Sequence, residues 1–565
     1  MPRIKTASRK RAWYSINPWG VVILVFFALA AQTYYVHIKP DPRILTQSQK
    51  QYWAQVPVST SRGDILDRNG IPLAISVPVT SLYIDPQSWL PENASALEPY
   101  LGKKVKDKFS RPLPGRFHWV ARKVPNDIAM PILGRNIEGL FSVRENQRQY
   151  PHASLGSHVL GYCDVDDMGL AGVEMAWNNI LYSPPQTRLL IRDAKGKMLD
   201  LIGSNAGVLD RGQSDIRLTI DSRFQQVVEW KLKDGIESTQ SKWGAVVCVN
   251  PNNGEIIAMA SYPTINPNDR SSFNKNREAL RNNAISRVYE PGSTFKPIIM
   301  GIALDMGITS LSHTFNCTGT VKIADGIIRN FNSRGHGLET TETTLIKSCN
   351  VGMALIGNRF EKHRTYSMLR QFGFGEKTDI EIAGEEEGLL RTPEKWLGMV
   401  PANLAIGQGI AVTPLQLAMG ISAIANGGTL LKPYLVAEVK DSKGNIVHRG
   451  TKRVRASVLT AGVSDWLRKT LRKTVIEGTG KGADTSLAEI AGKTGTAQIA
   501  TKAAYVKGQY VSSFVGFWPY KNPKYVLLVV LGEPKGAKYY GGEIAAPVFK
   551  TIVEDLVQIG SNPSS

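Results

Sequence analysis

The stretch Glu290–Pro297 constrains the fold of this chain more than any other part of the sequence. A Pro-Gly turn is followed by an apolar run to Ala303, which predicts a helix that begins near Ser293. Ser293 and Lys296 are three residues apart on that helix and therefore share one face. A serine needs an adjacent base to become a nucleophile, and a lysine whose pKa is lowered by burial or by a second cation can be that base. The pattern predicts a nucleophile–base pair at a helix start, where free backbone N–H groups can stabilise developing negative charge.

Two further motifs follow, and the set of three carries more weight than any one of them. Ser-x-x-Lys has only two fixed residues, and Ser272–Lys275 is a second copy in this chain. Ser348-Cys349-Asn350 lies farther along, and Lys493-Thr494-Gly495 lies farther still. Three such motifs in this order predict a serine acyl-transfer site that is assembled from distant segments.

The N-terminal segment predicts a membrane anchor. Basic residues fill the first part of the chain, and the apolar run Gly20–Ala31 follows with aromatic residues on both sides. This pattern predicts a membrane span over 18–38, with residues 1–17 in the cytoplasm and the rest of the chain outside. The alternatives are a signal peptide cleaved after Ala28-Leu29-Ala30 and a buried helix, although a buried helix does not explain the basic flank.

The formal net charge of +20 raises the question of a nucleic-acid partner. The basic residues are dispersed, and no helix-turn-helix, zinc or RNP-type pattern accompanies them. This distribution favours an envelope protein beside anionic lipid or acidic wall polymers, with no nucleic-acid partner.

Four cysteines, Cys163, Cys248, Cys317 and Cys349, are spread widely along the sequence. Their spacing argues against a zinc cluster and a small disulfide scaffold, so no metal site is predicted. Cys248 lies in an apolar run and is interpreted as a small core residue. A Cys317–Cys349 bridge stays open, as does Cys349 as a rival nucleophile, although no Cys-His signature surrounds it.

The length of 565 residues predicts several domains. Residues 39–215 contain short strand-like runs and an Asn-Gly hairpin at 69–70. This part shows no nucleophile–base pair. Four of its charged residues are therefore interpreted as structural ion-pair residues: Arg62, Asp67, Arg68 and Glu174.

Residues 216–565 are predicted to form an α+β domain. A hairpin over 244–260 opens it, and strands at 511–517 and 525–531 with a helix over 547–557 close it. The segments between are mostly helical, among them 414–425. A sheet whose strands come from both ends of a domain, with helices between, is an α+β arrangement.

The chain resembles the class B penicillin-binding proteins over nearly its whole length. The resemblance rests on the anchor, the three motifs, and three stretches of the N-terminal half: Arg62–Arg68, Arg148–Pro151 and Gly169–Glu174. It implies a cytoplasmic tail (1–17), a transmembrane anchor (18–38), a pedestal of the dimerisation type (39–215) and a β-lactamase-like transpeptidase domain (216–565). It also implies a bacterial inner-membrane protein with its catalytic domain in the periplasm.

Within this class the chain is most similar to the division-specific, septal transpeptidases. Ser348-x-Asn350 is followed by Val351-Gly352, and the end of the chain carries Lys538–Gly542 and Ala545–Phe549. Elongation-type relatives usually have Asp in place of the motif's Asn. Two departures are Cys349, where septal relatives more often have Ser, and Ser183–Gln186, where relatives tend to have glycines.

The resemblance also implies roles for the motif residues in catalysis. Ser293 attacks the penultimate D-Ala of a peptidoglycan stem peptide, and Lys296 takes its proton. Lys493 is a nearby cation that favours neutral Lys296. Ser348 relays a proton to the leaving nitrogen.

The remaining motif residues are expected to hold the substrate. Asn350 hydrogen-bonds the stem's amide, and Thr494 and Thr496 hold its terminal carboxylate together with Lys493. Gly495 allows the substrate to pair with an edge strand. The backbone N–H groups of Ser293 and Thr496 form the oxyanion hole.

No metal or organic cofactor is implied. The expected partners are stem peptides, β-lactams, membrane lipid, a polytopic glycosyltransferase and other division proteins. The alternatives are an elongation-type transpeptidase, a β-lactamase or D,D-carboxypeptidase, and a penicillin sensor or idle scaffold. The acidic cluster Glu385–Glu387 lacks the surroundings of a β-lactamase glutamate and is interpreted as a solvated loop.

Overall fold

A computed structural model describes residues 17–37, 53–58, 60–115, 117–184, 186–192, 198–199, 214–331, 333–500 and 505–561. Most of the basic tail predicted for 1–17 lies outside these ranges. The chain divides into two units, Met1–Ser59 with Pro184–Leu209, and Thr60–Ser183 with Asp210–Ser565.

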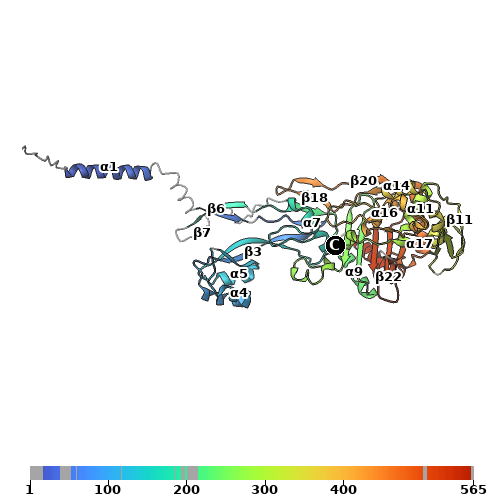
Figure 1. Cartoon of the computed structure of the whole chain (residues 1–565), viewed down its shortest axis with the longest axis horizontal. Coiled ribbons are helices and arrows are strands. Elements are labelled where there is room, and N and C mark those ends of the chain that lie inside the picture. The colour runs from blue at the N-terminus through green and yellow to red at the C-terminus, as the bar shows by residue number, and fades with distance from the viewer. Residues whose placement is uncertain are drawn as a thin grey trace, which may run out of the picture. The chain divides into compact units, whose positions relative to one another are not determined.

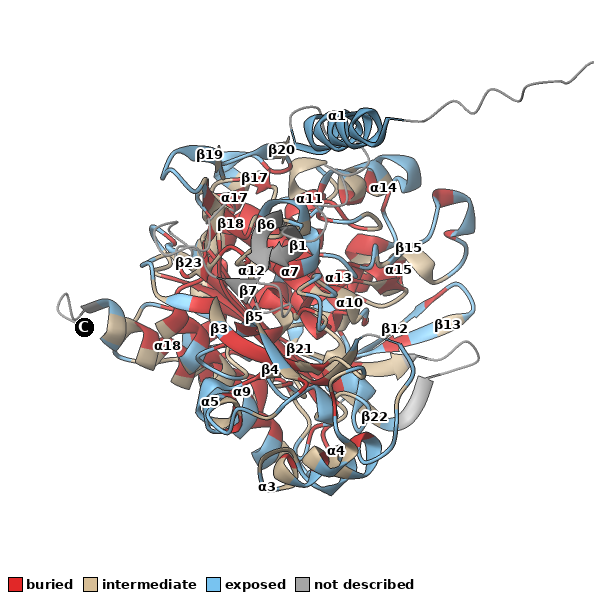
Figure 2. Cartoon of the chain, turned by 90° about the vertical axis from the view of Figure 1, so that its left-hand side faces the viewer, coloured by how far each residue is buried: buried red, intermediate tan, exposed pale blue. Residues whose placement is uncertain are grey.

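The smaller unit contains helix α1 (Pro18–His37) and a three-stranded sheet of β1 (Trp53–Val58), β6 (Gln186–Arg192) and β7 (Met198–Leu199). Among the helices in the described ranges, α1 alone is long and apolar enough to cross a membrane. Its 20 residues correspond to about 30 Å, the thickness of a hydrocarbon core. Figure 2 shows α1 exposed along its length, as expected of a helix that fits a single-pass anchor.

The larger unit begins with a seven-stranded sheet. Its path runs β19, β18, β8, β2, β3, β4, and β5 pairs with β3. The strands span Ile446–Arg449 (β19), Val436–Lys440 (β18), Asp215–Leu218 (β8), Ile65–Leu66 (β2), Pro72–Ile84 (β3), His118–Val124 (β4) and Leu140–Gln149 (β5). The antiparallel pairing of β2 with β3 around Gly70, whose φ is +87°, confirms the Asn-Gly hairpin. Helices α3 (Glu98–Leu101), α4 (Lys103–Phe109) and α5 (Asn126–Leu133) accompany this sheet.

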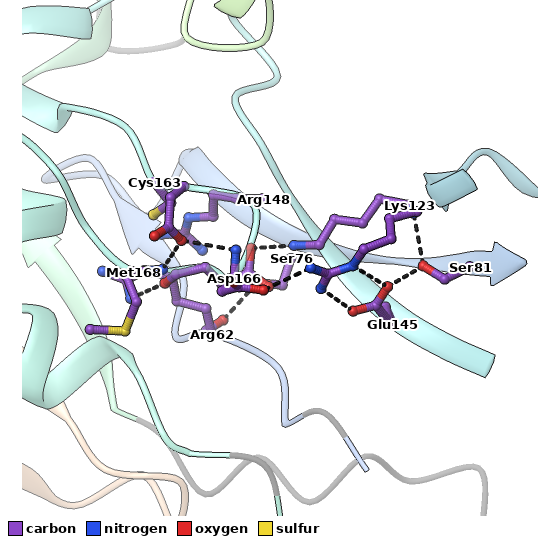
Figure 3. Close-up of polar contacts among 12 residues, drawn as sticks. Arg62, Ser76, Ser81, Lys123, Glu145, Arg148, Cys163, Asp166 and Met168 are labelled. Atoms are coloured by element: carbon purple, nitrogen blue, oxygen red, sulfur yellow. Dashed lines mark hydrogen bonds and ion pairs between the residues drawn. The ribbon is translucent and has the colours of Figure 1, made fainter. Parts of the chain in front are cut away.

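A buried ion network holds the start of this unit together. Arg62 Nε and Arg148 Nε each lie 2.6 Å from a different oxygen of Glu174, and all three side chains are at most 3% exposed. Figure 3 shows Arg62 and Arg148 on one side of the network and Glu145 with Lys123 on the other. The ion-pair interpretation is confirmed for Arg62 and Glu174.

The same interpretation is confirmed for Arg68 but not for Asp67. Arg68 Nη2 lies 3.1 Å from Glu255 Oε2. Asp67 instead accepts hydrogen bonds from the backbone N–H groups of Asn69 and Ile71 and from the Ser222 hydroxyl, at 2.7, 2.9 and 2.7 Å. Its carboxylate stabilises a turn and a helix start, because donors of the nearby backbone satisfy it.

The second part of the unit is built on a five-stranded antiparallel sheet in the order β10, β9, β23, β22, β21. These strands span Ile256–Tyr262, Trp243–Val249, Tyr525–Gly532, Tyr505–Trp518 and Ala491–Ala500. The predicted 244–260 hairpin is confirmed as β9 and β10, and the strands predicted at 511–517 and 525–531 lie within β22 and β23. Figure 1 shows strands from both ends of this part in one layer, which confirms the α+β class.

Both faces of this sheet are covered by helices. Val246 and Cys248 of β9 pack into a core with α9 (Ser222–Thr239) and α18 (Ala545–Ser561). Ala245 and Val247 point to the opposite core, which includes α16 (Pro414–Ala425) and α11 (Lys296–Asp305). This alternation follows from the two-residue period of a strand, and burial on both faces explains the continuous apolar run of β9. Cys248 is fully buried, as interpreted from sequence.

Candidate active site

The first motif lies where the chain enters α11. Gly292–Phe295 form a 3₁₀ turn (η4), and the α-helix begins at Lys296, three residues after the predicted start near Ser293. Gly292 has φ +56°, and a Cβ there would lie 3.2 Å from the Thr496 carbonyl oxygen. Glycine is therefore favoured both by conformation and by the close approach of the third motif. Ser293, the next residue, is half-buried.

Lys296 joins the first motif to the second. Its side chain is fully buried, and Nζ donates to the Ser348 carbonyl at 2.8 Å, to Ser348 Oγ at 3.3 Å and to Asn350 Oδ1 at 2.6 Å. Burial lowers the pKa of Lys296 to about 7, because removal from water disfavours the ammonium form. Three oxygens therefore surround an amine that is poised between its charged and neutral states.

The second motif sits between α12 (Thr341–Ile346) and α13 (Asn350–Gly357). Ser348 has φ +58°, a left-handed conformation that costs a non-glycine residue about 1 kcal/mol or more. In this conformation both its carbonyl and its hydroxyl contact Lys296. Asn350 is fixed by Arg329, whose carbonyl accepts from Nδ2 at 2.8 Å, and by Asn330, whose Oδ1 accepts from the Asn350 backbone N–H at 2.9 Å.

The third motif lies on β21, the last strand in the described sheet order. Lys493 is fully buried, and its Nζ lies 3.3 Å from Thr479 Oγ1 and 3.3 Å from the Thr494 carbonyl. Thr494 Oγ1 also lies 3.0 Å from Thr479 Oγ1. Burial, and secondly the charge of Lys296, place the pKa of Lys493 well below its ordinary value. The effect of one lysine on the pKa of the other shows that the first and third motifs lie close together.

Gly495 lets the third motif touch the first. A Cβ on Gly495 would lie 3.0 Å from the Pro291 carbonyl oxygen and 2.8 Å from Thr294 Cγ2. On its other side, the Gly541 backbone N–H donates to Thr496 Oγ1 at 2.9 Å. The fold therefore brings all eight predicted site residues into three adjoining segments: Ser293, Lys296, Ser348, Asn350, Lys493, Thr494, Gly495 and Thr496.

Sequence reasoning missed several residues that shape this site. Thr479 contacts both Lys493 and Thr494, and Gly541 contacts Thr496. Tyr540, next to Gly541, packs edge-on against the exposed Phe331 with ring centroids 4.3 Å apart. Of these residues, only Tyr540 and Gly541 lie in a stretch that the sequence had singled out, because Lys538–Gly542 is part of the family resemblance.

Two other sequence features that were weighed as catalytic candidates, the second Ser-x-x-Lys copy and the acidic cluster Glu385–Glu387, lie in surroundings unlike those of the active site. Lys275 of the second Ser-x-x-Lys copy is exposed, whereas Lys296 is fully buried. The solvated-loop interpretation is wrong for Glu385, which is buried because its carboxylate accepts bonds from the Thr378 backbone N–H and hydroxyl and the Asp379 N–H. That carboxylate has a structural role.

Comparison with known proteins identifies the family. Residues 244–554 match the family "Penicillin binding protein transpeptidase domain", and residues 57–208 match "Penicillin-binding Protein dimerisation domain". The chain is 31% identical over 551 residues to stage V sporulation protein D of Bacillus subtilis, covering 96% of this chain and 85% of that protein. It is 30% identical over 553 residues to the peptidoglycan D,D-transpeptidase FtsI of Escherichia coli K12, covering 95% and 90%.

Solved structures agree with this assignment. Penicillin-binding protein 3 of Mycobacterium tuberculosis, in complex with aztreonam, aligns with a TM-score of 0.68 and 25% identity over 90% of this chain and 98% of that one. A peptidoglycan synthetase from Bifidobacterium adolescentis, 24% identical over 91% of this chain and 98% of that one, has the same fold with a TM-score of 0.71. The fold and the paired domains define a penicillin-binding protein of two-domain architecture. The chain belongs to the penicillin-binding protein transpeptidase family, which confirms the family prediction.

Proposed function

We propose that this chain is a peptidoglycan D,D-transpeptidase that cross-links stem peptides at the division septum. Ser293 attacks the carbonyl of the penultimate D-Ala and expels the terminal D-Ala, which leaves an acyl-enzyme. The amine of a neighbouring stem then displaces Ser293 and forms the cross-link. The observation that carries this proposal is the buried Lys296, with a pKa of about 7, in contact with the second motif.

Lys296 serves as the general base in this proposal. A pKa of about 7 leaves roughly half of the amine neutral at pH 7, against well under 1% for an exposed lysine. Neutral Lys296 takes the Ser293 proton during attack. Ser348 Oγ, 3.3 Å from Lys296 Nζ, relays a proton to the leaving nitrogen.

The oxyanion hole consists of the backbone N–H groups of Ser293 and Thr496. The contact of Gly495 with Pro291 and Thr294 supports this role, because it brings β21 against the turn that carries the nucleophile. Preorganised backbone donors of this kind stabilise a tetrahedral intermediate by about 3–4 kcal/mol.

The substrate is held by the rest of the three motifs. Asn350 hydrogen-bonds the stem's amide, and Thr494, Thr496 and Lys493 bind the terminal carboxylate. An arriving carboxylate favours the ammonium form of Lys493, which burial disfavours in the empty site. Gly495 gives the substrate backbone room to pair with β21.

The location of the enzyme and its partners complete the proposal. Helix α1 crosses the inner membrane once with its N-terminus in the cytoplasm, so the transpeptidase domain works in the periplasm. Residues 18–38, 39–215 and 216–565 serve as anchor, pedestal and catalytic domain. The Ser348-x-Asn350 form of the second motif and the E. coli FtsI relative favour a septal role. Glycan polymerisation then comes from a polytopic glycosyltransferase of the division complex.

Labelling with a fluorescent penicillin, followed by peptide mapping, tests this function. We expect the adduct on Ser293 and no labelling of Ser293→Ala, whereas the matched variant Ser272→Ala labels like the native chain. An adduct elsewhere, or undiminished labelling of Ser293→Ala, overturns the assignment. Release of D-Ala from a stem-peptide substrate with an added amine acceptor distinguishes transpeptidation from hydrolysis and from sensing.

A further inference from the structure

Four potential metal ligands converge beside the second motif. They are Cys317 at the end of β11 (Thr314–Cys317), His336, Glu339 in β14 (Gly337–Thr340), and Cys349 at the start of α13. One ligand atom from each lies within 4.8 Å of every other. We propose that these residues form a structural site for a divalent d-block ion, with zinc as the best match for two thiolates, an imidazole and a carboxylate.

The local fold explains why residues distant in sequence meet here. β11 and β14 pair antiparallel, with Cys317 opposite Gly337, and the Cys317 carbonyl accepts from the His336 backbone N–H at 3.0 Å. Asn330 links this hairpin to the helix, because its Nδ2 lies 3.0 Å from Cys317 Sγ and its Oδ1 accepts from the Asn350 backbone N–H. The site is therefore framed by backbone pairing, independently of any ion.

Two of the ligand distances match the edges of a tetrahedral site, and a third is too short. His336 Nδ1 lies 3.7 Å from Cys317 Sγ and 3.3 Å from Glu339 Oε1. Metal–ligand bonds of about 2.3 Å to sulfur and 2.0–2.1 Å to nitrogen or oxygen give tetrahedral edges of roughly 3.6 and 3.3 Å for these two pairs. The sulfurs of Cys317 and Cys349 are 3.1 Å apart and need to separate by about 0.7 Å to reach the roughly 3.8 Å edge of two thiolates.

Glu339 supplies a second, independent observation. Its side chain is 0% exposed, and within the described chain neither carboxylate oxygen has a hydrogen-bond partner on nitrogen or oxygen. The nearest cations are His336, if protonated, and the half-exposed Lys347, whose Nζ is 3.6 Å away. The thiol of Cys349 is the one hydrogen-bond donor to this carboxylate in the described chain. A buried carboxylate with so weak a partner is costly, and a directly bound cation reduces that cost.

The alternative for the two sulfurs is a disulfide. A Cys317–Cys349 bridge leaves His336 and Glu339 without a function in the cluster and leaves the buried carboxylate beside uncharged sulfur. A metal ion uses all four side chains and balances most of their negative charge. The cluster is thus better matched to an ion, although the wide cysteine spacing had argued against a metal site: two of the ligands are not cysteines, and the fold brings the four together.

The place of the site suggests what the ion does. Cys349 lies between Ser348 and Asn350, both of which contact Lys296 Nζ. Four protein ligands leave no open position for a reacting water, so the ion has a structural role and fixes the second motif. A role of the ion in catalysis, through the position of Ser348 and Asn350, rests on the proposed function; ion binding itself does not.

Metal analysis of the full chain tests the proposal. The protein is purified in detergent with a tag free of histidine, and metal is counted by mass spectrometry before and after addition of Zn²⁺. We expect about one zinc per chain in the native protein, in Ser293→Ala and in the control Cys248→Ala, and strong loss in Cys317→Ala, His336→Asn and Glu339→Gln. Loading with Co²⁺ should give the visible bands of tetrahedral cobalt and the charge-transfer band of cobalt–thiolate bonds in the native chain, Ser293→Ala and Cys248→Ala, but not in the three ligand variants.

Two results overturn the proposal. One is a chain that takes up no more Zn²⁺ than His336→Asn does. The other is a metal-free protein in which peptide mapping without reductant finds a Cys317–Cys349 disulfide, and which takes up no Zn²⁺ after the disulfide is reduced. Failure of this proposal can be told apart from failure of the proposed function. If the proposed function is wrong, penicillin does not label Ser293, but the metal count of the native chain and of Ser293→Ala stays at about one.

Discussion

The pedestal and the catalytic domain both bury charged groups, but they treat them in opposite ways. In the pedestal, Glu174 receives two arginines at 2.6 Å. Burial alone would raise the pKa of Glu174, but Arg148 and Arg62 lower it below its usual value. In the catalytic domain, Lys296 contacts neutral oxygens, and burial lowers its pKa to about 7. Paired buried charge fixes a structure, whereas unpaired buried charge yields a group that can exchange a proton.

The largest expected effect follows from replacing Lys296 by a residue that cannot lose its positive charge. Lys296→Arg keeps the positive charge at neutral pH, because a guanidinium does not lose its proton in proteins. We expect acylation by penicillin to slow by about 10²–10⁴-fold, the usual contribution of a general base. Stopped-flow or gel-based labelling rates measure this. Lys275→Arg is the control, and equal rates for native and Lys296→Arg protein would refute a base role.

The second prediction concerns the buried ion pairs of Glu174 with Arg62 and Arg148 in the pedestal. Glu174→Gln leaves Arg62 and Arg148 without their buried carboxylate, which should destabilise the larger unit by about 3–5 kcal/mol. Thermal unfolding measures the loss, and acylation per folded molecule should stay near the native value. Glu98→Gln, which breaks an exposed pair with Lys106, is the control and should leave the unfolding temperature unchanged. A slower acylation step in folded Glu174→Gln would show that the two regions are not separable in this way.

The pH dependence of stability also tests whether Lys296 is an unpaired buried cation, because the direction of the change depends on the direction of its pKa shift. The folded pKa of Lys296 is lowered from the model-peptide range near 10.4 to about 7, so between these values the unfolded chain binds more protons. The contribution of this lysine to stability should therefore rise as pH rises from about 7 to 10. Comparison of the native chain with Lys296→Met by denaturant unfolding isolates it. The two proteins should differ in pH slope, and identical slopes would contradict the lowered pKa.

The smallest effect concerns a neighbour of the second lysine. Thr479→Val removes the hydroxyl that contacts Lys493 and Thr494 at 3.3 and 3.0 Å. The loss of about 1 kcal/mol should raise KM for a stem-peptide substrate about fivefold and leave kcat nearly unchanged. Thr551→Val on α18, which removes only a helix-internal bond to Val548, serves as the control. A change confined to kcat would place Thr479 in proton transfer instead.

Much of this site was accessible from sequence because the motifs are contiguous. Ser293 with Lys296, and Ser348 with Asn350, were found because their motifs occur in order with a third one, and the strands 511–517 and 525–531 were found by composition. Thr479, the left-handed Ser348 and the Gly541–Thr496 contact were not, because they depend on segments that meet only in three dimensions. The ligand cluster of Cys317 and Glu339 was missed for the same reason: a pairing between two short strands creates it.

The most direct test of the central claim is the pH dependence of acylation. The rate constant for labelling by penicillin, measured on the native chain from pH 5.5 to 9.5, should rise about tenfold per unit at low pH and level off with a midpoint near 7, where Lys296 loses its proton. A rate that is flat across this range, or one that still rises at pH 9.5, would contradict a buried, unpaired lysine as the base.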